Sequence, residues 1–97
     1  MSGSSPAFIS EFIEAFVDAG VYIGIPHKEA LNVICDTIIG TAEMLKTGEI
    51  NTSDLKYMVC SPGGTTIEGI RTLENKGFKS ALIEAIISTY NKNNNLR

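Results

Sequence analysis

The fold of this chain is decided around residues 61–68, which read Ser61-Pro62-Gly63-Gly64-Thr65-Thr66-Ile67-Glu68. Proline has a fixed φ and holds the residue before it in an extended conformation, while the two glycines can adopt positive φ. Thr65 and Glu68 have the spacing of a capping box, in which the threonine caps a helix and the glutamate reaches back. The stretch therefore predicts a tight glycine loop that opens a helix from about residue 66 to residue 75.

The start of this helix has two interpretations. Amide groups without helical partners and the positive end of the helix dipole converge there, an arrangement that suits a small anion such as a carboxylate or phosphate. The same residues also make a tight turn with a good cap. From the loop alone, the tight turn is the simpler interpretation.

An amphipathic helix is expected near the beginning of the chain, over about residues 7–19. Ser4 or Ser5 can cap it, and Pro6 suits its first turn. Gly20 is expected to end it, and Gly24 to make a turn after it. Its apolar positions share one wide face: Phe8, Ile9, Phe12, Ile13, Phe16, Val17 and Ala19.

A second long helix is expected from about Pro26 to Lys46, ended by Gly48. One apolar stripe is formed by Leu31, Ile34, Cys35, Ile38, Ala42 and Leu45. Other apolar residues lie off that stripe: Ala30, Val33, Ile39 and Met44. A helix that is apolar on more than one side is normally covered by more than one neighbour. In so small a chain a second copy can provide that cover, and Gly40 in mid-helix suggests a close helix–helix approach.

Two further helices complete the prediction. A short one follows the capping cluster of residues 51–54 and covers about Leu55 to Val59, and the last covers about Lys79 to Lys92 after Gly77. Residues 91–97 are polar and are expected to fray. Because no stretch alternates as a strand does, the fold class is all-α, a single domain of about five helices over residues 1–97.

Composition excludes several classes of function. The chain has 97 residues, is 43% hydrophobic and carries a formal net charge of −3 without a basic run. Nucleic acid and anionic membranes are therefore poor partners. No apolar run has the length of a membrane span, and no signal peptide opens the chain. No G-x-G-x-x-G or P-loop pattern occurs, so no cofactor site is expected in this chain.

The single histidine and the two cysteines do not make a recognisable site. His27 is interpreted as a solvated surface residue, and Cys35 as a core residue on the apolar stripe. Cys60 adjoins the glycine loop, and no basic neighbour argues for a reactive thiolate. No spacing of these residues suggests a metal site. Reduced thiols, and hence a cytoplasmic location, are the expectation.

Several blocks together give this sequence a resemblance to a known family. The early blocks are Ser2-Gly3-Ser4-Ser5-Pro6-Ala7-Phe8, Glu14-Ala15, Asp18-Ala19-Gly20-Val21, Gly24-Ile25-Pro26 and Ala30. The later ones are Leu55-Lys56, Val59, residues 61–67, Gly69, Leu73-Glu74 and Gly77-Phe78. In this order and spacing they resemble the C-terminal domain of pyrroline-5-carboxylate reductase, the last enzyme of proline synthesis.

The departures from that family are few but one is large. Ser5 stands where the family usually has glycine, and the acidic residue common before the final leucine is missing before Leu96. The family also places a dinucleotide-binding Rossmann domain before this one, and no such domain is present here. Met1 directly precedes the family's opening motif, which is typical of an excised domain or a truncated gene.

The resemblance implies a fold and an assembly. It implies an all-helical domain of the 6-phosphogluconate dehydrogenase C-terminal type, whose helices interlock with those of a second subunit in a homodimer, often assembled further into rings. It also implies a role in reducing pyrroline-5-carboxylate to proline, with NADPH or NADH bound by the rest of the full enzyme. The isolated chain is expected to be inactive.

The resemblance also implies site residues. The loop amides near Gly63, Gly64 and Thr65, together with Ser61, would hold the substrate carboxylate. The Thr66 hydroxyl would hydrogen-bond the ring nitrogen and help deliver a proton, which makes Thr66 the expected catalytic residue. Glu49 corresponds by spacing to an acidic position that lines the site in some relatives. The alternative function is a stand-alone, non-catalytic helical dimerisation module.

Overall fold

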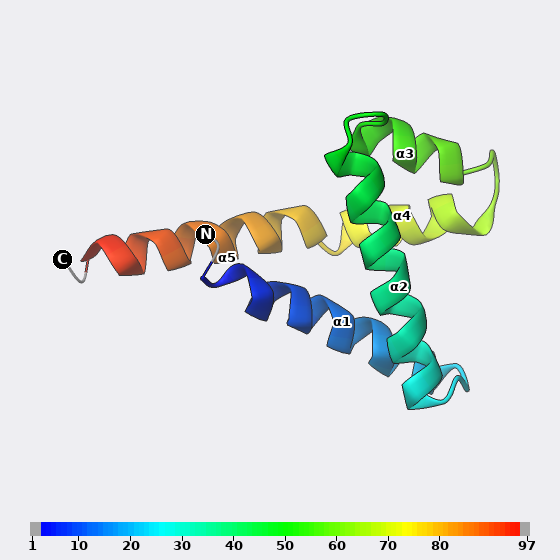
Figure 1. Cartoon of the computed structure of the whole chain (residues 1–97), viewed down its shortest axis with the longest axis horizontal. Coiled ribbons are helices and arrows are strands. Elements are labelled where there is room, and N and C mark those ends of the chain that lie inside the picture. Colours follow the sequence, from blue (N-terminus) through cyan, green and yellow to red (C-terminus); the bar gives the residue numbers. More distant parts are fainter. Residues whose placement is uncertain (1–2, 96–97) are drawn as a thin grey trace. The chain divides into compact units, whose positions relative to one another are not determined.

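A computed structural model describes residues 3–95 of the chain, and every regular element in that range is a helix. The helices are α1 (Ser5–Tyr22), α2 (His27–Lys46), α3 (Thr52–Val59), α4 (Thr65–Asn75) and α5 (Phe78–Asn95) (Figure 1). They form two compact units: among the described residues, one contains α1 and α2 (residues 3–51) and the other contains α3, α4 and α5 (residues 52–95). The prediction of an all-α fold of five helices is confirmed.

In the first unit, α1 and α2 are joined by a tight turn (Figure 1). The Gly24 amide donates to the Val21 carbonyl at 3.0 Å, and the Ile25 amide donates to the Gly20 carbonyl at 2.8 Å. This pair of bonds is the Schellman motif, which requires positive φ at the residue after the C-cap. Gly24 has φ +102°, which explains a glycine at this position. The predicted turn at Gly24 is confirmed.

Gly20 does not end α1, so that prediction is wrong. The helix continues to Tyr22, and Gly20 is buried inside it. A Cβ added to Gly20 would lie 3.0 Å from the Cβ of Ala30, which is tighter than an ordinary contact. Gly20 is therefore a packing residue, because a side chain at this position would require α1 and α2 to move slightly apart.

The core of this unit is small. Val17, Ala30 and Ile34 are its buried hydrophobic residues, and Ala30 is only 1% exposed. Ile13, Ile25 and Ile38 pack against them and are partly buried. Ala30 was placed off the main stripe of α2 by its sequence position, whereas it is the centre of the contact with α1. The stripe prediction holds for Ile34 and Ile38.

Most other apolar residues of the two helices are exposed in the single chain. On α2, Val33 is 50% and Ile39 is 58% exposed, as expected for residues off the packed stripe. Five large apolar residues of α1 are exposed as well: Ile9, Phe12, Phe16, Val21 and Tyr22. Within the described residues nothing lies within 4 Å of a Cβ added to Gly40, so the close approach predicted there is not made inside the chain.

The second unit contains three helices, and α4 and α5 are held together by a short connection at residues 76–77. The Gly77 amide donates to the Glu74 carbonyl at 3.1 Å, and the Lys79 ammonium pairs with the Glu74 carboxylate at 3.5 Å. None of the residues described for α3 or α4 is buried. Large apolar residues exposed in this unit are Tyr57, Met58, Val59, Ile67, Leu73, Phe78, Leu82, Ile83, Ile87 and Tyr90.

The helix boundaries differ from the prediction mainly at their ends. Pro26 is the N-cap of α2 and not its first residue, because its ψ of 142° is extended. The short helix begins at Thr52, inside the expected capping cluster. The last helix continues to Asn95, where fraying was expected from residue 91. Predictions that involve Met1, Ser2, Leu96 and Arg97 lie outside the described residues.

Candidate functional site

The glycine loop is a tight turn between α3 and α4. The Gly64 amide donates to the Ser61 carbonyl at 3.0 Å, which closes a four-residue turn over residues 61–64. Pro62 is the second residue of that turn and Gly63, with φ +68°, is the third. Proline followed by a residue with positive φ is the sequence of a type II turn. The sequence prediction of a tight glycine loop is thus confirmed, although of its two glycines only Gly63 has positive φ.

The predicted capping box is wrong. Gly64 is the N-cap of α4, no side chain caps the helix, and Thr65 is its first residue. Because the helix begins one residue earlier than expected, Glu68 is the fourth helical residue and is too far along to reach back to the cap. Its carboxylate instead pairs with the Arg71 guanidinium at 3.5 Å, and both side chains are exposed. The Glu68 carboxylate therefore does not occupy the amides at the start of α4.

The hydroxyl of Thr66 is available for a ligand. Three threonine hydroxyls elsewhere in the helices donate to backbone carbonyls one turn earlier: Thr37 to Val33, Thr72 to Glu68 and Thr89 to Ala85. Thr66 is the second residue of α4, so the carbonyl four residues earlier belongs to the turn and not to the helix. Among the described residues, its hydroxyl has no hydrogen-bond partner.

Amide donors gather beside that hydroxyl. The first amides of any helix lack partners within the helix, and the helix dipole adds positive potential there. The Gly64 amide is used by the turn, so the donors at this helix start are those of Thr65 and Thr66, with Gly63 beside them. The Gly64 amide, which was expected among the donors for an anion, is therefore already occupied within the turn. The loop residues are exposed or partly buried, and the amides of Gly63, Thr65 and Thr66 donate no hydrogen bond among the described residues.

The structure brings Ser61, Gly63, Gly64, Thr65 and Thr66 together in one loop, as the sequence predicted. Glu49 belongs to the other unit, where it is exposed in the turn that follows α2. Cys60 precedes the loop, is partly buried and is a free thiol. Its amide donates to the Lys56 carbonyl at 3.0 Å and so continues the last turn of α3.

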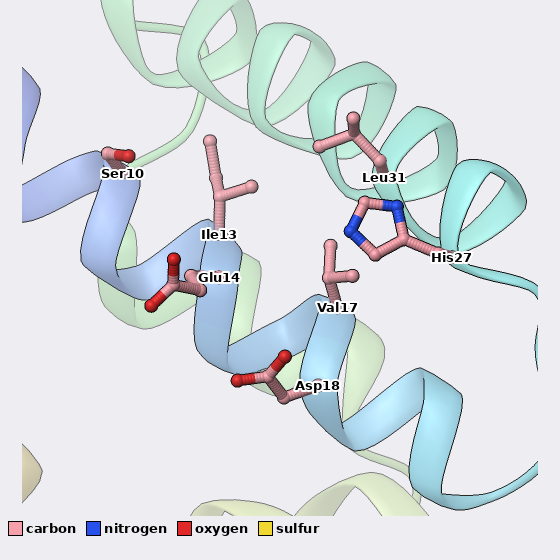
Figure 2. Close-up of a pocket in the computed structure, with 7 residues that line it drawn as sticks. All are labelled: Ser10, Ile13, Glu14, Val17, Asp18, His27 and Leu31. Atoms are coloured by element: carbon pink, nitrogen blue, oxygen red, sulfur yellow. The ribbon is translucent and has the colours of Figure 1, made fainter.

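A hollow between α1 and α2 was not predicted from the sequence. It has a volume of about 290 Å³ and is lined by Ser10, Ile13, Glu14, Val17, Asp18, His27 and Leu31 (Figure 2). Ile13 and Val17 point toward α2, whereas the carboxylates of Glu14 and Asp18 point away from the His27 ring in this view. The signal in the sequence is the acidic pair at a spacing of four beside the helical apolar face.

The side chains that line this hollow do not form a catalytic or metal-binding group. Among residues 3–95, no ion pair joins His27 to Glu14 or Asp18. The same part of the chain holds no group of three or more metal-ligating side chains. His27 is exposed, as its sequence position predicted. None of the described helices combines the length and apolar character needed to span a membrane.

Comparison with known proteins places this arrangement in a family. Residues 1–96 match the family described as pyrroline-5-carboxylate reductase dimerisation. The chain belongs to this family. The resemblance carried by the sequence blocks is confirmed.

The family's members include enzymes that are closely similar to this chain. Pyrroline-5-carboxylate reductase from Escherichia coli (strain K12) is 50% identical over 97 residues, which cover 99% of this chain and 36% of that protein. The reductase from Aquifex aeolicus (strain VF5) is 47% identical over 92 residues, covering 95% and 35%. This chain therefore spans about a third of the length of the relatives it matches.

Solved structures in the family have the same helical arrangement. The 1-pyrroline-5-carboxylate reductase of the human pathogen Streptococcus pyogenes matches with a TM-score of 0.89 at 44% identity, over 92% of this chain and 34% of that one. Pyrroline carboxylate reductase from Plasmodium falciparum, solved with NADP bound, matches with a TM-score of 0.87 at 37% identity, over 90% and 35%. The fold predicted from the family resemblance is confirmed.

Proposed function

We propose that this chain is the dimerisation and substrate-binding domain of a reductase that converts pyrroline-5-carboxylate to proline with NADPH or NADH. The observation that carries the proposal is the loop of residues 61–66, where, among the described residues, a turn, unbonded amides and an unpartnered hydroxyl meet at the start of α4. The whole chain acts as one such domain, and a Rossmann domain elsewhere in the complete protein binds the dinucleotide.

The chemistry of the loop fits that substrate. Pyrroline-5-carboxylate is a cyclic imine that carries a carboxylate, so it offers an anion and a ring nitrogen at a fixed separation. The amides of Gly63, Thr65 and Thr66 hold the carboxylate at the positive end of α4. The Thr66 hydroxyl, which can donate and accept, hydrogen-bonds the ring nitrogen and helps to deliver a proton to it.

The features that bind a dinucleotide cofactor are not found in this sequence or in its described residues. Its sequence contains no G-x-G-x-x-G turn to approach a pyrophosphate, and the described residues form no strand from which such a turn could start. The nicotinamide held elsewhere supplies the hydride, and this chain binds, orients and protonates the substrate. The NADP bound to the Plasmodium falciparum protein supports a cofactor of this type.

Ser61 completes the proposed loop site. The Ser61 hydroxyl lies at the start of the turn and is exposed, so it can donate to the carboxylate. Glu49 corresponds by spacing to an acidic position that lines the site in some relatives, and it stays a candidate on that correspondence alone.

A homodimer is part of the proposal. Val17, Ala30 and Ile34 are the only hydrophobic residues of residues 3–95 that the single chain buries, while many large apolar residues on all five helices are exposed. Obligate interfaces of this kind bury more than about 2,000 Å² and resemble a domain core cut in half. A second copy covers these faces, and further assembly into rings follows the pattern of the family.

A non-catalytic dimerisation module is the second candidate. The exposed apolar faces need a partner whether or not the loop binds substrate, so they favour this candidate as strongly as the first. The loop discriminates between the two candidates. Only the reductase domain gives a role to the amides and the unpartnered hydroxyl at the start of α4.

The test is an assay of NADPH and NADH oxidation with pyrroline-5-carboxylate. The complete protein that carries this domain is expected to oxidise one or both cofactors, and the isolated 97-residue chain neither. A complete protein that forms dimers but shows no turnover would favour the non-catalytic module. Turnover by the isolated chain would contradict the assignment of the cofactor site to another domain.

A further inference from the structure

Gly64 is not explained by its backbone conformation. Its φ of −82° and ψ of 176° are extended, a conformation that any L-residue adopts. Gly63 differs, because its φ of +68° lies in the region that favours glycine. Another reason is therefore needed for a glycine at position 64.

Position 64 is a glycine because Ser61 occupies the space that a side chain there would need. A Cβ added to Gly64 would lie 2.5 Å from the Ser61 Oγ and 3.2 Å from the Ser61 carbonyl oxygen. The first separation is far below van der Waals contact, so a side chain at position 64 and the present Ser61 hydroxyl exclude each other. The missing side chain of Gly64 is what allows the Ser61 hydroxyl to lie where it does.

The Ser61 hydroxyl lies at the N-terminal end of α4. The side chain of an N-cap residue normally projects over the second and third amides of the helix. Gly64 is the N-cap of α4, so the Ser61 hydroxyl lies beside the space that a capping side chain would enter. Among the described residues the Ser61 hydroxyl has no hydrogen-bond partner, and Ser61 is exposed. Its proton is therefore available to a ligand at the helix start.

We propose that Gly64 is a positioning residue, whose missing side chain keeps the Ser61 hydroxyl at the start of α4, where it donates a hydrogen bond to the substrate carboxylate. The inference rests on the proposed function. It assigns the two residues different tasks: Ser61 contacts the carboxylate, and Gly64 acts through Ser61. Gly64 itself contributes no donor, because its amide is bound to the Ser61 carbonyl at 3.0 Å.

The test is a double-mutant cycle in the complete reductase, with Ser61→Ala, Gly64→Ala and both together. Each single change is expected to raise KM for pyrroline-5-carboxylate by about ten-fold, the effect of losing one hydrogen bond to a charged group. The double variant is expected to raise KM no further than Ser61→Ala alone, because the hydroxyl that Gly64→Ala displaces is already gone. Melting temperature should fall in Gly64→Ala and recover in the double variant.

Gly69→Ala is the matched control. It makes the same change in the same helix, where the added Cβ meets nothing within 4 Å, and it should leave KM unchanged. Effects on KM that multiply to about a hundred-fold in the double variant would overturn the positioning role, as would an unchanged KM in Ser61→Ala. A complete protein without turnover before any substitution is a different outcome, because it rejects the proposed function and this inference with it.

Discussion

At the scale of single residues, threonine hydroxyls differ in what their position in a helix allows. Thr72 is seven residues into α4 and donates to the Glu68 carbonyl at 3.1 Å, whereas Thr66 precedes every helical carbonyl that it could reach. The place of Thr66 at the helix start therefore leaves its hydroxyl without a backbone partner among the described residues.

Thr66→Ala in the complete reductase is expected to lower kcat/KM by on the order of 10²–10⁴-fold, the usual effect of removing a proton-delivering group. Melting temperature should change little, since the hydroxyl makes no bond within the described chain. Thr72→Ala is the control, because its hydroxyl serves only a backbone carbonyl and its loss should leave the rate intact. An unchanged rate in Thr66→Ala would reject its catalytic assignment.

Thr65→Ala is expected to leave stability nearly unchanged, within about 0.5 kcal/mol. A capping threonine would cost about 1 kcal/mol, but Thr65 is the first residue of α4 and makes no capping bond. Urea unfolding of the two chains measures the difference. A loss as large as that of a cap would show that Thr65, and not Gly64, takes the cap position in solution.

The sequence predicted which residues form the loop, because proline, two glycines and two threonines each restrict the backbone locally. It could not predict which of these residues is the N-cap of the helix and which amide closes the turn. The spacing of Thr65 and Glu68 is that of a capping box, yet the turn closed by the Gly64 amide moves the helix start by one residue. The Pro-Gly sequence fits the turn that the Ser61–Gly64 bond closes, but the spacing of Thr65 and Glu68 favoured a different helix start, and the pattern alone did not decide between them.

At the scale of elements, the contact between α1 and α2 depends on Gly20 and Ala30. Gly20→Ala is expected to destabilise the chain by about 1–3 kcal/mol, because the new Cβ would lie 3.0 Å from the Ala30 Cβ. This outweighs the gain of about 0.5–1 kcal/mol that alanine brings to a helix interior. Urea unfolding measures the result.

The control for that prediction is again Gly69→Ala, which should stabilise the chain because it adds helix propensity without a clash. Adding Ala30→Gly to Gly20→Ala should recover part of the loss by restoring room between the helices. If Gly20→Ala were instead as stabilising as Gly69→Ala, α1 and α2 would not approach each other as described.

The number and order of the helices could be predicted because each has its own apolar periodicity and end signals. The error at Gly20 shows that local sequence signals alone do not predict where a helix ends. Gly20 and Gly24 both follow an apolar run and both fit the end of a helix locally. Which of them ends α1 depends on the packing of Gly20 against Ala30, ten residues later in the chain.

At the scale of the whole molecule, the exposed apolar residues of α2 require a partner. Val33→Glu or Ile39→Glu is expected to dissociate or unfold the assembly, because an unpaired charge buried in an interface costs several kcal/mol. In a monomer both residues would remain half exposed, at 50% and 58%, and the same changes would cost little. Sedimentation velocity and circular dichroism distinguish these results.

Asn32→Glu supplies the control for these variants, since it adds the same charge to an exposed polar position of α2. It should keep both the mass and the helix content of the unmodified chain. If Val33→Glu and Ile39→Glu behaved like Asn32→Glu, the extra apolar face of α2 would not be part of the interface.

The central claim is that a second copy of this chain covers the apolar faces that one copy leaves exposed. The most direct measurement is light scattering on the unmodified chain at micromolar concentration, with circular dichroism on the same sample. We expect a helical species with at least twice the 10.4 kDa mass of one chain. A well-folded helical species with the mass of a single chain would contradict the claim.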